Sequence, residues 1–155
     1  RQGDAVSIDV RGTTVGIGGG KGFGGGFAKM AAASFGEPEM KAFADHAAER
    51  AASLGTALSA HAMRAADVRV ALVHYAPVPA TLAGEPPELF PWLGSHLLAE
   101  AIDAAGGIAL AVHGHAHYGS EQGVTPGGTP VRNVARPVVG GAYAVYTVPG
   151  VTRVR

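Results

Sequence analysis

The chain has no cysteine among its 155 residues, which excludes a disulfide framework, a thiolate metal site and a cysteine nucleophile. Charged residues make up only 15% of the chain, and 12 basic side chains balance 12 acidic ones. A neutral chain of this kind offers no evident nucleic-acid-binding surface. It also lacks both an apolar run of about 18 residues and a signal-peptide core. We therefore expect a cytoplasmic protein with no membrane span.

What the chain does have is 47% hydrophobic residues and 24 glycines, in a length that suits one domain with its own core. Residues 4–19 alternate apolar and polar side chains around Arg11 and Gly12, which predicts a β-hairpin or two short strands. The following segment, GGGKGFGGGF, contains a G-x-G-x-x-G pattern. A segment with this many glycines matches such a pattern easily by chance, so the match is weak evidence. A flexible connecting loop is the favoured interpretation, ahead of a nucleotide-binding loop.

The remainder of the chain predicts alternating helices and strands. Apolar spacing predicts one long helix over residues 37–64, with Pro38 in its first turn and a loosening at Gly55. A shorter helix is predicted to begin after Ser95, which is its expected N-cap, and to end before Gly106. Strands are expected over 68–75, 107–117, 129–138 and 142–148, and a long proline-rich loop over 76–94. This order indicates a layered α/β domain.

Three of the seven histidines alternate in the stretch AVHGHAHYG, at positions 113, 115 and 117. In extended backbone, alternate side chains point to one side, about 6.5–7 Å apart. His74 ends another apolar strand, and open α/β sheets place their sites at the carboxyl ends of strands. Two apolar strands that both terminate in histidine therefore predict a metal or catalytic site at this edge.

The remaining histidines have simpler interpretations. His113 precedes the glycine, so we expect it to be a hydrogen-bonded structural residue that supports a ligand from behind. His46 and His61 fall on the predicted long helix and are expected to be solvated. His96 follows the helix N-cap and is a weaker candidate for contact with a substrate.

The motif GHAH at 114–117, with LVHYAP upstream of it, resembles the last two motifs of calcineurin-like metallophosphoesterases. The segments GFGGGF, HYAPVPATLAGEPPELFPWLGS and HGHAHYG…GTPVRNVARPV also resemble the C-terminal half of bacterial members, so the resemblance covers most of the chain. It implies a two-sheet α/β sandwich with flanking helices and two divalent metal ions, Mn, Fe or Zn, at the strand ends. It further implies that His74 and His115 ligate one ion and His117 the other, and that a metal-activated hydroxide attacks a phosphoester.

The chain departs from this family in its first half. The D-x-H, G-D and G-N-H motifs are absent as a set, although Gly3 and Asp4 form an isolated G-D pair. Asn133 follows the GHAH motif, which is the wrong order for the missing asparagine ligand. No residue here takes the role of the catalytic acid. We therefore expect residues 1–155 to be the C-terminal portion of a longer phosphodiesterase, completed by an N-terminal segment or a complementary chain.

If this interpretation holds, the loop 76–94 faces the substrate. Tyr75, Tyr118 and Trp92 could then stack against a base or an aromatic leaving group, although the core is the favoured place for Trp92.

Two other classes of function stay open. His74, His115 and His117 could instead hold a single zinc ion with a water in the fourth position. A degenerate domain that acts as a binding module or scaffold would need no metal at all. A JAMM-type isopeptidase is disfavoured, because Gly128 occupies the position where that family has an aspartate.

Overall fold

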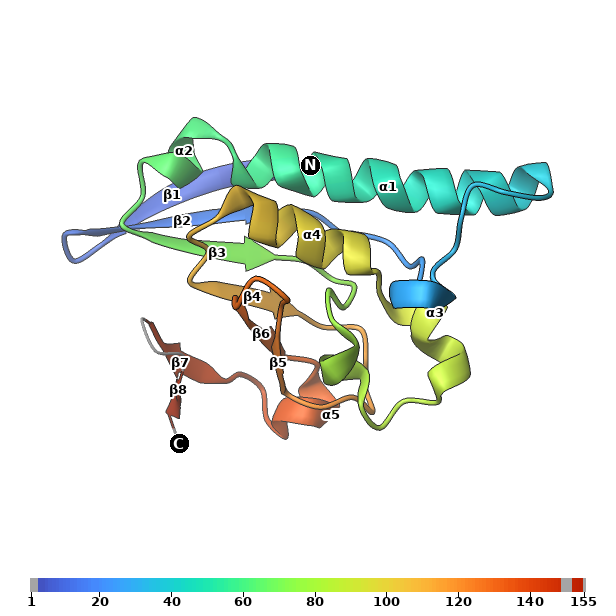
Figure 1. Cartoon of the computed structure of the whole chain (residues 1–155). Helices are drawn as coiled ribbons and strands as arrows, with labels where there is room; N and C mark the ends of the chain where they lie inside the picture. Colours follow the sequence, from blue (N-terminus) through green and yellow to red (C-terminus); the bar gives the residue numbers. More distant parts are fainter. Residues whose placement is uncertain (1–2, 149–151, 155) are drawn as a thin grey trace.

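The structure is a computed structural model that describes residues 3–148 and 152–154, and its elements are shown in Figure 1. The strands are β1 (Asp4–Val10), β2 (Thr13–Gly19), β3 (Val68–Leu72), β4 (Leu110–His113), β5 (Gln122–Val124), β6 (Pro130–Asn133), β7 (Val145–Thr147) and β8 (Thr152–Val154). The α-helices are α1 (Pro38–Leu58), α2 (His61–Arg64), α3 (Phe90–Leu93), α4 (His96–Ala105) and α5 (Arg136–Val139). Short 3-10 turns are η1 (Ala28–Met30), η2 (Pro79–Leu82) and η3 (Pro87–Leu89).

The main sheet has six strands in the order β1-β2-β3-β4-β6-β5, and β7 pairs with β8 in a small second sheet. Strands β2, β3, β4 and β6 are parallel, whereas β1 and β5 pair antiparallel at the two edges. Helix α1 connects β2 to β3, and α4 connects β3 to β4. The prediction of an α/β fold is therefore confirmed. Parallel strands end at one edge of the sheet, and this brings the segments after β3 and β4 together.

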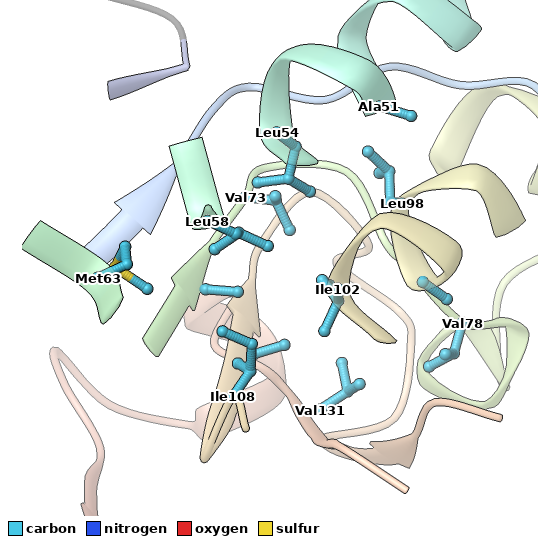
Figure 2. Packing of buried hydrophobic residues seen from close by; sticks show 13 residues of the cluster. Ala51, Leu54, Leu58, Met63, Val73, Val78, Leu98, Ile102, Ile108 and Val131 are labelled. Atoms are coloured by element: carbon cyan, nitrogen blue, oxygen red, sulfur yellow. The ribbon is translucent and has the colours of Figure 1, made fainter. Parts of the chain in front are cut away.

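Helices α1 and α4 lie side by side on one face of the main sheet (Figure 1). Their apolar sides close over β3, β4 and β6 to form the core seen in Figure 2. At Gly18 a side chain would place its Cβ 2.9 Å from Leu58 Cδ2, so this glycine lets α1 approach β2. The buried members of the cluster are Ala51, Leu54, Leu58, Met63, Ala71, Val73, Val78, Leu98, Ala99, Ile102, Ile108, Ala111 and Val131.

The opposite face of the sheet is open to solvent over β1 and β3. Val6 is 54% exposed, Ile8 47% and Val10 48%, and Leu72 of β3 is 50% exposed. Val6 pairs with Ile17 across the β1–β2 ladder, so the apolar row continues into β2, where Ile17 is half-buried. Sheets with parallel strands are normally covered on both faces, which makes this apolar face unusual.

Several local predictions are confirmed. The hairpin turns at Arg11 and Gly12, which both have positive φ. Pro38 begins α1, and the Ser95 side chain accepts a hydrogen bond from the Leu97 backbone N–H at the start of α4. In the described part of the chain, no helix combines the length and hydropathy that a membrane crossing requires.

The prediction of a single long helix over residues 37–64 is wrong for the C-terminal part of that range. Helix α1 continues through Gly55 and ends at Leu58, and Ala60 is in extended backbone before the separate helix α2 begins. This break turns the chain back toward the sheet, where Met63 is completely buried. Burial of that side chain explains why the helical pattern does not continue in one straight helix.

The predicted strands are longer than the observed ones, and β5 was not predicted. Strand β3 ends at Leu72, β4 at His113 and β6 at Asn133, and of 142–148 only Val145–Thr147 pairs. Residues after Asn133 turn into α5, and the predicted loop 76–94 contains η2, η3 and α3. Sequence periodicity does not show where pairing stops, because pairing depends on the neighbouring strand.

Candidate functional site

The structure brings His74 and His115 together at the carboxyl edge of the sheet. Their ring centroids are 4.6 Å apart, although one follows β3 and the other follows β4. The Tyr75 ring lies 4.5 Å from that of His115. The backbone N–H groups of His74 and Tyr75 donate to the Lys21 carbonyl at 3.0 and 3.3 Å, which fastens the glycine-rich loop to this edge. The pair is thus held by three segments that are distant in sequence.

The backbone at His115 is left-handed, with φ of +70°, which non-glycine residues seldom adopt. The expectation that His113, His115 and His117 share one side of an extended strand is therefore wrong. Strand β4 ends at His113, and the chain turns immediately, as the Ala116 N–H donates to the Gly114 carbonyl at 2.8 Å. Strained backbone of this kind costs about 1–3 kcal/mol and is enriched at functional sites, although Arg11 adopts it in the hairpin turn as well.

His113 lies in the interior, with no exposed surface. Its Nδ1 lies 2.7 Å from the Gly114 carbonyl oxygen, and its Nε2 lies 2.8 Å from the Thr81 hydroxyl. Burial lowers the pKa of His113 to about 4, although the hydrogen bond to Gly114 opposes this effect. A neutral imidazole that donates from Nδ1 to Gly114 fits this geometry when the single proton of the Thr81 hydroxyl points to Nε2 instead of to the Val78 carbonyl oxygen, which lies 3.1 Å from the same hydroxyl.

Two further side chains hold the turn that carries His115 and His117, and sequence reasoning did not find either role. The buried Asn133 donates from Nδ2 to the Ala116 carbonyl at 2.7 Å. The carboxylate of Glu85 accepts a hydrogen bond from the Tyr118 backbone N–H at 2.8 Å. A polar asparagine inside the apolar run VRNV was the available signal for such an anchor.

The electrostatics around His74 favour its neutral form. Protein atoms that partly screen the ring from water lower the pKa of His74, and the positive charges of His115, Lys21 and His117 lower it further. Histidine binds metal ions in its neutral form, so this shift makes His74 a competent ligand at neutral pH.

The donor set only partly fits a metal centre. His74 and His115 are close enough to converge on one ion, and His117 is exposed beside them. However, within residues 3–148 and 152–154 no group of three histidine, aspartate or glutamate side chains could hold a metal ion. A preassembled three-histidine zinc site is therefore not present. The imidazoles also carry no negative charge, so a carboxylate from elsewhere is needed to neutralise two divalent cations.

The other candidate residues lie in different surroundings. His96 is half-buried, with Nδ1 3.2 Å from the Gly26 carbonyl oxygen and Nε2 3.9 Å from the Glu100 carboxylate. Tyr118 is 77% exposed. The expectation that Trp92 fills the core is wrong, because its side chain is 58% exposed.

The glycine-rich loop is packed rather than free. The Gly25 N–H donates to the Pro91 carbonyl at 2.7 Å, and the Gly26 N–H donates to the Gly94 carbonyl at 2.9 Å. A Cβ at Gly24 would lie 2.4 Å from the Pro91 oxygen, so only glycine allows this approach to α3. The loop does not lead directly into α1, which the dinucleotide-binding arrangement requires.

Comparisons with known proteins provide no relative from which a role could be transferred to these residues. No family model, no curated protein and no solved structure matches the chain.

Proposed function

We propose that this chain supplies the histidine ligands of a dinuclear, metal-dependent phosphoester hydrolase of the calcineurin-like type. The observation that carries the proposal is the 4.6 Å separation of the His74 and His115 rings at the carboxyl edge of two adjacent parallel strands. The left-handed backbone at His115 adds support, because strain of this kind is retained where a side chain must be aimed.

In this proposal His74 and His115 hold one divalent ion, and His117 contributes to a second. The ions, when bound, lower the pKa of a water molecule and stabilise the phosphoryl oxygens. The protein's own contribution is orientation. His113 and Asn133 fix the turn from the buried side, so that His115 and His117 project from a defined backbone.

The missing carboxylates are proposed to come from a complementary segment or chain that packs a second sheet onto this one. The open, apolar face of β1 and β3 supports this part of the proposal, since Val6, Ile8 and Leu72 are about half exposed there. Face-to-face packing of two sheets would bury such a row and complete a two-sheet sandwich. The sequence encoded upstream of Arg1 tests this directly: D-x-H, G-D and G-N-H motifs are expected in it.

Metal titration of the 155-residue chain tests the ligand assignment. Calorimetry with Zn²⁺ or Mn²⁺ is expected to show binding that His74→Ala and His115→Ala each weaken by about tenfold or more. His61→Ala is the matched control, because His61 is exposed on α2, at the opposite end of β3. Equal metal affinity in the His115 variant and the control would refute the assignment. Absence of any metal binding in the protein that also contains the complementary part would instead favour a scaffold.

Activity provides the second test, in the protein that contains the complementary part. His115→Ala and His117→Ala are each expected to abolish metal-dependent phosphodiesterase activity, whereas His113→Ala is expected to be much milder. Retained activity in the first two variants, or equal loss in all three, would contradict the proposed division of roles.

A further inference from the structure

A surface pocket of about 370 Å³ lies where the end of the glycine-rich loop and η1 meet η3 and the start of α3. No histidine is among the described residues that line it, so it is a second candidate site, separate from the histidine pair. Its volume is in the range of small-molecule sites in proteins. The side chains that line it are Phe27, Met30, Pro87, Glu88, Phe90 and Pro91.

Phe27 and Phe90 are two walls of this pocket that meet at nearly a right angle. Their ring centroids are 6.4 Å apart, and the angle between the ring planes is 85°. Both rings are half-buried, because they pack on a small buried cluster of Ala76, Leu82 and Ala116. A cation placed in the corner between two such rings is attracted by the π-electrons of both. Packing on the buried cluster keeps this corner in place.

The backbone on both sides of Phe27 is left-handed. Gly26 has φ of +87°, and Ala28 has φ of +49°. A Cβ at Gly94 would lie 2.8 Å from Phe27 Cζ, so the glycine at the end of α3 makes room for the ring. An alanine in left-handed backbone is strained, and strain of this kind is enriched where a ligand is bound. The chain therefore accepts strain at Ala28 in the segment that places the Phe27 ring.

The described lining of the pocket carries one charged group, the carboxylate of Glu88. Glu88 is exposed, and it forms no ion pair within the described part of the chain. The pocket thus combines apolar and aromatic walls with an unpaired negative charge. This combination favours a ligand that is apolar in shape but carries a positive charge.

The remaining walls suit an apolar cation as well. Met30 lines the pocket although it is 82% exposed, and its polarizable thioether can adapt to a methyl-covered surface. Pro87 and Pro91 have a backbone φ that is fixed by the proline ring. Rigid walls lower the entropy that must be lost when a ligand is bound.

We propose that this pocket binds the quaternary ammonium group of a small free ligand such as choline. The trimethylammonium group lies in the corner between Phe27 and Phe90, and Glu88 balances its charge. A quaternary ion has no N–H group, so it loses no hydrogen bond to water when it enters a mostly apolar pocket. The inference involves no metal and does not depend on the proposed hydrolase activity.

Choline can be compared directly with its neutral carbon analogue 3,3-dimethyl-1-butanol, in which a tert-butyl group replaces the trimethylammonium group. Each is titrated into the isotope-labelled, metal-free 155-residue chain at constant chloride concentration, and the backbone amide signals are followed by NMR. Choline is expected to shift the signals of Phe27, Met30 and Phe90 in a saturable manner. It should bind about tenfold more tightly than the analogue, because only choline carries a charge.

Equal affinities for choline and the analogue would overturn the proposal, and so would the absence of saturable shifts at these residues. A third arm distinguishes a free ligand from a lipid headgroup. Cosedimentation of the chain with phosphatidylcholine vesicles, without any binding of free choline, would also overturn the proposal.

Variants separate the charge from the shape of the pocket. Glu88→Gln is expected to weaken choline binding several-fold and to leave binding of the neutral analogue unchanged. Phe90→Leu keeps an apolar side chain but removes one ring, and is expected to weaken choline binding more than binding of the analogue. Glu39→Gln is the matched control, because Glu39 is exposed in the first turn of α1 and does not line the pocket.

Circular dichroism checks the fold of each variant. Equal choline affinities in the Glu88 and Glu39 variants would contradict the role of the carboxylate. The exposed position of Glu88 keeps this test valid even if Phe90→Leu disturbs the small buried cluster.

Discussion

Protonation of the buried His113 is expected to destabilise the fold as the solution becomes acidic. The folded pKa is about 4, below the ordinary value of 6.5, because burial penalises the charged ring. The unfolded chain therefore binds more protons than the folded one between these two pH values, and the free energy of unfolding falls as the pH is lowered through them. The difference between the two pKa values corresponds to about 3 kcal/mol.

The assay is urea unfolding of the metal-free chain at pH 7.5 and at pH 4.5, for the wild type and for His113→Gln. Glutamine cannot be protonated in this range, and its amide can replace the hydrogen bond that Nε2 makes with Thr81. Most of the loss of about 3 kcal/mol should be present at pH 4.5 in the wild type and missing in the variant. Other histidines, including His74, contribute to both proteins and cancel in the comparison.

Parallel stability curves for the two proteins would refute this reasoning. They would mean that the folded state accommodates an imidazolium ring at position 113, with both ring nitrogens donating hydrogen bonds. The same geometry around Thr81 and Gly114 would then stabilise the charged form, and the cost of burial would have been overestimated.

Two further predictions concern the turn that carries the candidate ligands. Asn133→Leu removes the 2.7 Å hydrogen bond to the Ala116 carbonyl, which keeps only the longer bond from the Gly119 N–H at 3.4 Å, and it leaves the Ala135 N–H without the Asn133 oxygen at 3.0 Å. This variant should lose about 1–3 kcal/mol in urea unfolding, and a variant as stable as the wild type would contradict the anchoring role of Asn133. Gly119→Ala places a Cβ 2.2 Å from the Thr81 carbonyl oxygen and should lower the melting temperature by several degrees. Gly141→Ala is its control, since the nearest atom there is 3.7 Å away; equal melting temperatures for the two variants would contradict the predicted clash.

The hairpin turn and the starts of the two longer helices could be predicted from the sequence, because a few neighbouring residues determine them. The hairpin at Arg11 and Gly12 follows from alternation around a turn, and the starts at Pro38 and Ser95 follow from capping chemistry. The end of α1 could not be predicted in this way. It depends on burial of Met63 under the sheet, which is a contact between distant segments.

The sequence by itself determined that any metal here must be bound by nitrogen and oxygen, because it contains no cysteine, and that two apolar strands end near histidine. Only the tertiary structure decided which histidines meet. Strand pairing brings His74 against His115, a left-handed residue takes the chain out of the strand, and His113 is left inside. Likewise, packing of the glycine-rich loop and α3 exposes Trp92 instead of burying it. Residue type limits the available chemistry, whereas contacts between remote segments decide which groups can act together.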